Sequence, residues 1–89
     1  MTMQIEFDPA KDAANIAKHG ISLARGEDLE LVAYIEDRRF PEPRFRLYGL
    51  IDGIAYCLAG TDRDGSIRVI SLRRARAKEL RRHGWPDND

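Results

Sequence analysis

The chain has 89 residues, which is enough for one domain and too few for two independent hydrophobic cores. Hydrophobic residues make up 43% and charged residues 34% of it, a composition that excludes a disordered chain and a membrane span. Fifteen Lys and Arg balance fifteen Asp and Glu, so a uniformly basic coat for nucleic acid is also excluded. The two signs are nevertheless segregated. Residues 1–42 carry five basic and nine acidic side chains, whereas residues 43–89 carry ten and six.

Cysteine and histidine are scarce, which limits the covalent and metal chemistry of the chain. Cys57 is the single cysteine, so no internal disulfide can form. One cysteine and two distant histidines match no spacing of a metal site. The first residues reach Glu6 and Asp8 without an apolar run, so we expect no signal peptide, no membrane association and a cytoplasmic protein.

The first elements are a strand and a helix. Ile5 and Phe7 alternate with polar residues and predict a strand over residues 3–7. Asp8-Pro9 is typical of a helix N-terminus, with Asp as the cap and Pro at the first helical position. Lys18-His19-Gly20 is typical of its C-terminus. The apolar positions of this helix predict its buried side: Ala10, Ala13, Ala14, Ile16 and Ala17.

The next segment predicts a second helix, from a cap at Ser22 to about Leu31, although Gly26 weakens this interpretation. Its inward residues are expected to be Leu23, Leu29 and Val32. A short strand over 33–35 and a stiff loop over 41–43 should follow.

The second half of the chain predicts a three-stranded antiparallel meander and a basic helix. The strands are expected at 44–51, 54–61 and 67–72, with turns at 52–53 and 62–65. The helix should run from about Arg74 to His83, and residues 84–89 should form a frayed tail. We therefore predict a single α+β domain over residues 1–89, in which helices pack on one face of a small twisted antiparallel sheet made of the meander and the N-terminal strand.

Arginine is the residue type that suggests a functional site. Arg44, Arg46 and Tyr48 share one face of their predicted strand by alternation. Arg68 lies on the third strand of the meander, and Arg73 lies at the junction with the last helix. Residues 68–82 hold seven basic side chains and one acid, Glu79. Such guanidinium groups can bind phosphate and stabilise charge developing on it. The alternative is that arginine stems cover apolar surface while their charged ends stay in water.

Two other side chains each allow a functional and a structural interpretation, and the structural one is favoured for a third. His19 can act as a general acid or base, or it can bind the last carbonyl groups of its helix. Glu79 can act as a general base, or it can pair with Arg76 three residues earlier. Cys57 is expected to be a small core residue.

Three blocks of this sequence resemble the BrnT toxins of bacterial type II toxin–antitoxin pairs. The first is Phe7-Asp8-Pro9-Ala10-Lys11 with Asn15 and Lys18-His19-Gly20-Ile21. The second is Arg44-Phe45-Arg46-Leu47-Tyr48-Gly49, and the third is Ile67-Arg68-Val69-Ile70-Ser71 with Arg73, Ala75 and Glu79. The chain departs from the family at Phe7, where many members have Trp, and at Leu72, where a small residue is usual. It also has no Tyr near His83, which puts a C-terminal acid in doubt.

The resemblance implies a RelE-like fold and a metal-independent endoribonuclease without a cofactor, which inhibits translation. It also implies an RNA substrate and a cognate antitoxin with a DNA-binding domain, through which alone the toxin contacts operator DNA. The implied catalytic residues are His19, Arg46, Arg68, Arg73 and Glu79, with a lysine as the alternative base to Glu79 and Tyr48 as the alternative acid to His19. The implied RNA-binding residues are Lys11, Lys18, Arg44, Tyr48 and Arg76. The competing hypothesis is a non-catalytic basic module that binds an acidic protein partner. DNA binding by the chain alone is disfavoured, since no helix-turn-helix pattern is present.

Overall fold

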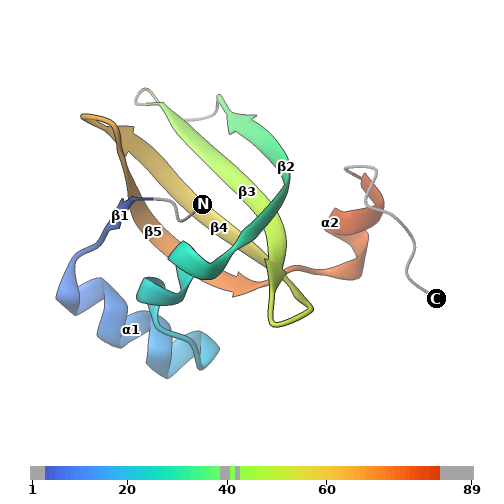
Figure 1. Cartoon of the computed structure of the whole chain (residues 1–89), viewed down its shortest axis with the longest axis horizontal. Helices are drawn as coiled ribbons and strands as arrows, with labels where there is room; N and C mark the ends of the chain where they lie inside the picture. The colour runs from blue at the N-terminus through green and yellow to red at the C-terminus, as the bar shows by residue number, and fades with distance from the viewer. Residues whose placement is uncertain (1–3, 39–40, 42, 83–89) are drawn as a thin grey trace.

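One five-stranded sheet, ordered β1-β5-β4-β3-β2, forms the centre of the protein (Figure 1). The structure is a computed structural model that describes residues 4–38, 41 and 43–82. The strands are β1 (Ile5–Glu6), β2 (Glu30–Asp37), β3 (Arg44–Ile51), β4 (Ile54–Arg63) and β5 (Ser66–Arg74). Strands β2 to β5 pair antiparallel in chain order, while β1 pairs parallel to β5. The predicted α+β class and the meander are confirmed. The sheet is mixed rather than purely antiparallel.

Helix α1 (Pro9–His19) begins and ends where the sequence predicts. The Asp8 side chain accepts a hydrogen bond from the backbone N–H of Ala10, and Gly20 ends the helix in the left-handed conformation. The predicted buried side is wrong, because Ala10, Ala13, Ala14, Ile16 and Ala17 are all exposed. Asn15 is the buried residue of this helix.

Asn15 is buried because its side chain pairs with the backbone of β5. Its amide donates to the carbonyl oxygens of Leu72, at 2.8 Å, and Ile21, at 2.9 Å, and its Oδ1 accepts from the Leu72 N–H at 3.2 Å. β1 pairs with β5 only at Ile67 and Arg68, so it does not reach this part of the β5 edge. The side-chain amide thus replaces a neighbouring strand at Leu72 and attaches α1 to the sheet.

A 3₁₀ helix, η1 (Leu23–Asp28), stands where a longer α-helix was predicted. Ser22 caps it as expected, and Asp12 of α1 accepts hydrogen bonds from the Ser22 hydroxyl and the Leu23 N–H. Helix η1 lies so close to the sheet that a Cβ on Gly26 would stand 2.8 Å from Leu58 Cδ1. The chain then leaves the helical conformation before Leu31, and β2 is much longer than the three-residue strand predicted.

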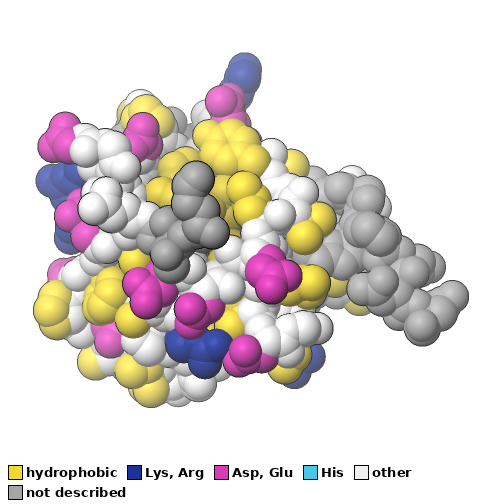
Figure 2. Space-filling view, in the orientation of Figure 1, with side chains coloured by type: hydrophobic (Ala, Val, Ile, Leu, Met, Phe, Trp, Pro, Cys, Tyr) yellow, Lys and Arg dark blue, Asp and Glu magenta, His cyan; other side chains and the backbone are white. Residues whose placement is uncertain are grey.

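The core lies on the face of the sheet that η1 covers. It is built mainly from Leu23, Leu29, Phe45, Leu47, Ile51, Leu58, Val69 and Leu72. The predicted inward positions Leu23 and Leu29 are buried, but Val32 is 48% exposed. On the side of the molecule that carries α1 and η1, acidic side chains are scattered between apolar ones (Figure 2). The opposite face of the sheet, called the open face below, carries Arg46, Tyr48 and Arg73.

A single extra residue in β5 determines which side chains reach the open face. Ala59 pairs with Ser71, but the next residue, Gly60, pairs with Val69, which leaves Ile70 as a β-bulge. Val69 and Leu72 are therefore both buried in the core although they are three residues apart. Arg73, next to Leu72, consequently lies on the open face.

The last described element, α2 (Ala77–Arg82), is shorter than predicted. Arg74 belongs to β5 rather than to the helix, and none of the six residues of α2 is buried. Helix α2 lies near the end of β5 (Figure 1), and its Glu79 side chain binds Arg73 on the open face, so the helices do not all cover one face as expected. His83, the predicted tail 84–89 and Glu42 of the predicted loop lie outside the described residues. Among the described residues no helix is long and apolar enough to cross a membrane.

Candidate active site

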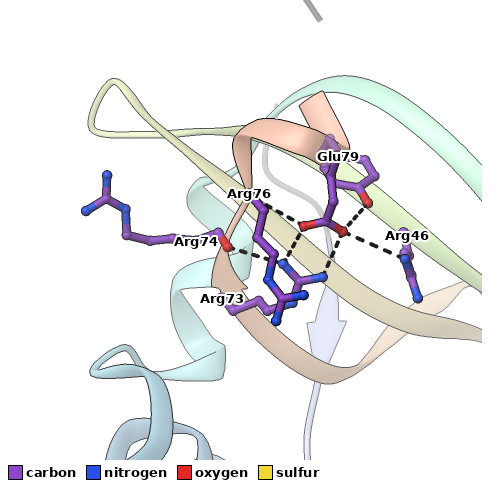
Figure 3. Close-up of polar contacts among 6 residues, drawn as sticks. Arg46, Arg73, Arg74, Arg76 and Glu79 are labelled. Atoms are coloured by element: carbon purple, nitrogen blue, oxygen red, sulfur yellow. Dashed lines mark hydrogen bonds and ion pairs between the residues drawn. The ribbon is translucent and has the colours of Figure 1, made fainter. Parts of the chain in front are cut away.

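Arg46, Tyr48, Arg73 and Glu79 meet on the open face, and we call these four side chains the Glu79 cluster. Figure 3 shows Arg46 and Arg73 on either side of Glu79. Arg73 binds the Glu79 carboxylate through two parallel hydrogen bonds, Nη1 to Oε1 at 2.7 Å and Nη2 to Oε2 at 2.9 Å. The Tyr48 hydroxyl donates to Oε2 at 2.9 Å, and Arg46 Nη1 lies 3.8 Å from the same oxygen. Two cations and a hydroxyl thus converge on one carboxylate.

The sheet register brings the first three members together. Tyr48 pairs with Cys57, and Cys57 pairs with Arg73, so these residues form one row across β3, β4 and β5. Arg46 lies two residues before Tyr48 and therefore on the same face of β3. The row is partly shielded from water, since Tyr48 and Cys57 are almost fully buried.

Glu79 reaches the cluster because of its position in the first turn of α2. It is the third helical residue, and its Oε1 accepts a hydrogen bond from the backbone N–H of Arg76, the capping position, at 3.1 Å. This contact is half of a capping box. Glu79 binds the Arg76 backbone here, rather than forming the side-chain pair with Arg76 that the spacing suggested. The same carboxylate therefore starts α2 and attaches it to the sheet.

The pKa values show how tightly the charges are coupled. The hydrogen bonds from Arg73 are the main cause that lowers the pKa of Glu79 to about 2. Burial, and then the hydrogen bond to Glu79, raise the pKa of Tyr48 to about 12. The pKa of Arg73 is raised, chiefly by the hydrogen bond to Glu79. Burial also raises the pKa of Cys57, so this thiol is protonated at neutral pH and is a poor nucleophile.

This arrangement is suited to a tetrahedral anion. Arg73 presents the two-pronged geometry that fits a carboxylate or a phosphate, and Arg46 adds a second positive charge. Tyr48 keeps its proton at neutral pH and can donate it in a hydrogen bond or a proton transfer. Glu79 is at present the anion that occupies the site, and as a carboxylate of very low pKa it is a weak base while Arg73 remains bound to it.

The other residues singled out in the sequence lie elsewhere. His19 and Lys18 are exposed in the last turn of α1, outside the Glu79 cluster. Arg76 contributes its backbone N–H to the cluster. A hollow of about 360 Å³ is lined in part by Lys11, Arg44 and Arg68, so the structure brings these three predicted residues together at a different place. Sequence reasoning missed Thr61 and Arg63, which also line it. The hairpin register would have found Thr61, because it pairs with Arg68.

Comparison with known proteins identifies the class. The family model that matches residues 7–79 is described as a ribonuclease toxin, BrnT, of a type II toxin–antitoxin system. The protein is thus a ribonuclease and the toxin component of such a pair, which implies an antitoxin as its partner. This assignment decides against the non-catalytic binding module.

The match spans most of the chain, and the chain therefore belongs to the BrnT family. The crystal structure of the ribonuclease toxin BrnT from Brucella abortus is similar, with 29% sequence identity and a TM-score of 0.64. The similarity covers 84% of this chain and 99% of the Brucella chain. No curated protein sequence matches the chain at a significant level.

Proposed function

We propose that the protein cleaves RNA internally at the Glu79 cluster, without a metal ion. The observation that supports this site is the convergence of Arg46, Arg73 and the Tyr48 hydroxyl on a single anionic group. These are the groups that stabilise a phosphate while negative charge accumulates on its oxygens. Within the described residues, no other carboxylate is bound by two arginines and a tyrosine together.

The substrate phosphate takes the place that the Glu79 carboxylate now holds against Arg73. A phosphate offers the same pair of oxygens to the guanidinium group and carries its charge at the same position. Arg46 already lies beside this position and supplies the second positive charge. As the phosphate binds Arg73, Glu79 loses the hydrogen bonds that lower its pKa most, so its pKa rises toward the ordinary value and it becomes a stronger base.

The reaction is a transfer within the RNA strand. The 2′-oxygen of the ribose attacks the adjacent phosphorus and forms a new P–O bond, while the P–O5′ bond breaks. Glu79 accepts the proton of the 2′-hydroxyl, and Tyr48 donates a proton to the departing 5′-oxygen. The products are a 2′,3′-cyclic phosphate and a free 5′-hydroxyl, so no water or cofactor is consumed. His19 and Arg68 have no part in this step, because neither belongs to the cluster.

The antitoxin completes the proposed system. We infer that it blocks the open face in the cytoplasm and carries a DNA-binding domain, through which the toxin contacts its operator. The toxin has no role of its own in reading DNA, in keeping with its zero net charge.

The test is cleavage of a defined RNA by the purified chain in the presence of EDTA. We expect fragments that end in a cyclic phosphate, and we expect Arg73→Ala to lower kcat at least about 100-fold, as for the loss of one charge-stabilising donor. Arg25→Ala is the matched control. Arg25 binds Asp28 and Asp52, and η1, which carries it, covers the other face of the sheet from the cluster, so its loss should leave cleavage unchanged. Absence of cleavage, cleavage that requires a divalent metal, or an active Arg73→Ala would each refute the proposal.

A further inference from the structure

We infer that the hollow beside Arg44 and Arg68 binds a second phosphate of the same RNA strand, one that is not cleaved. It is called the basic hollow below, and the inference rests on the function proposed above. The basic hollow holds about 360 Å³, which is within the size range of small-ligand sites.

The basic hollow gathers positive charge from four separate elements. Lys11 comes from the first turns of α1, Arg44 begins β3, Arg63 ends β4, and Arg68 lies in β5. Thr61, which pairs with Arg68 across the sheet, adds a hydroxyl group to the lining. Asp62 is the single acidic residue of the lining, and Glu6 lies 3.9 Å from Arg68. Lys11, Arg63 and Arg68 alone outnumber Asp62 and Glu6, and this excess of positive charge favours an anionic ligand.

The position of the basic hollow relative to the Glu79 cluster indicates which anion it takes. Arg44 and Arg46 lie two residues apart on one face of β3, a span of about 7 Å. Arg68 and Arg73 lie in β5, on either side of the Ile70 bulge, and both are turned away from the core positions next to them, Val69 and Leu72. Arginines thus run along the open face from the cluster to the basic hollow.

A single RNA strand fits such an arrangement because its phosphates recur at regular short intervals along one backbone. The strand that places one phosphate against Arg73 carries further phosphates along the sheet. The basic hollow also has apolar walls, Pro43 and Ile70, against which a ribose or a base can pack. Arg68 and Lys11 therefore act in substrate binding rather than in the chemical step, which separates them from Arg73.

The test combines a change in the protein with a change in the length of the substrate. Once a cleavage site has been mapped, two RNA substrates are made, the cleaved dinucleotide alone and the same dinucleotide with four extra nucleotides on each side. Arg68→Gln and Lys11→Gln are compared with the wild type and with Arg25→Gln, which removes one positive charge at the other end of the sheet. Binding is measured in parallel with the long RNA that carries a 2′-deoxy nucleotide at the cleaved position, so this measurement does not depend on cleavage.

We expect Arg68→Gln to raise KM for the long RNA about tenfold, the effect of one hydrogen bond to a charged group, with little change in kcat. For the dinucleotide the wild type and variant should be alike. The slope of log Kd against log salt for the deoxy RNA should fall by about 0.7 for each lost phosphate contact.

Equal KM and Kd values for the wild type and all variants on the long RNA would overturn the inference while leaving the proposed cleavage intact. Variants that bind RNA normally but no longer bind the antitoxin would also overturn it, since the basic hollow would then be a protein-binding site. Absence of cleavage by the wild type would instead refute the proposed function, and binding of an unmodified RNA of the same length would then decide between binding and no binding at the basic hollow.

Discussion

Replacing Asn15 with alanine should destabilise the protein strongly although the change is small and conservative for a helix. The Asn15 side chain makes three hydrogen bonds, two to Leu72 and one to the carbonyl oxygen of Ile21. Both contacts with Leu72 are buried, and the alanine variant leaves the N–H and C=O groups of Leu72 without these partners.

The expected loss in the free energy of unfolding follows from these contacts. Each hydrogen bond contributes about 1 kcal/mol net, and a buried group left unpaired costs about 1–3 kcal/mol. Alanine has the higher helix propensity, which returns roughly 0.6 kcal/mol. The balance is a destabilisation of about 3 kcal/mol, which for a domain of this size lowers Tm by about 15 °C.

Urea unfolding followed by circular dichroism measures this difference. The matched control is Ile16→Ala, the neighbouring residue on the same helix, whose side chain is 47% exposed. The control should lose less than about 1 kcal/mol, because little of its apolar surface is buried. If Asn15→Ala lost no more than Ile16→Ala, the side-chain amide would not be acting as a substitute for a strand, and the reasoning would be wrong.

Two further predictions concern the Glu79 cluster and the packing of β2. The pKa of Glu79 is lowered, so its ion pair stabilises the fold above the ordinary pKa near 4.5 and this contribution disappears as the pH falls toward 2. After an allowance for solvent screening, the ion pair contributes about 2 kcal/mol at pH 7. The difference in unfolding free energy between wild type and Glu79→Gln should therefore shrink between pH 5 and pH 2. A difference that stays constant over this range would contradict the assignment. Gly49→Ala should cost about 2–3 kcal/mol in urea unfolding, because the new Cβ would overlap the carbonyl oxygen of Glu30 and stand 2.8 Å from Leu29 Cγ. A neutral effect would mean that β2 moves aside freely.

Local signals in the sequence predicted the elements whose ends are fixed by local chemistry. Asp8 and Gly20 bound α1 as expected, and the Asp52-Gly53 turn joins β3 to β4 with both residues at positive φ. These features depend on residues within one turn of each other, so a single sequence suffices to locate them. The turn between β4 and β5 was predicted at residues 62–65 but consists of Asp64 and Gly65, both of which adopt positive φ values.

Long-range contacts explain the errors. The alanines of α1 suggested an apolar face, but the residue that matters is Asn15, whose partner Leu72 lies 57 residues away. Residues 30 and 31 were expected to end a helix, whereas they pair with β3 and belong to β2. Tertiary pairing overrode local propensity in that segment.

The candidate site was predicted in its composition but not in its grouping. The sequence identified Arg46, Arg73, Glu79 and Tyr48 separately, yet nothing local indicates that α2 folds back to bring Glu79 to Tyr48, 31 residues earlier. His19 was predicted as a catalytic residue because imidazole can transfer protons and because it lies in a block that resembles the family. The sequence does not show that α1 holds it outside the Glu79 cluster. The division of the arginines between the Glu79 cluster and the basic hollow required the register of the sheet.

The bulge at Ile70 makes the proposed site depend on the number of residues in β5 as well as on their identity. Arg73 is five residues after Arg68, an odd spacing, and an unbroken strand would turn these two side chains to opposite faces. If the same residues formed an unbroken strand, every functional side chain would still be present, yet Arg73 would point into the core and Leu72 into water. Homologous chains with this five-residue spacing should therefore keep the bulge, whereas chains with one residue fewer between the two arginines should have a regular strand there.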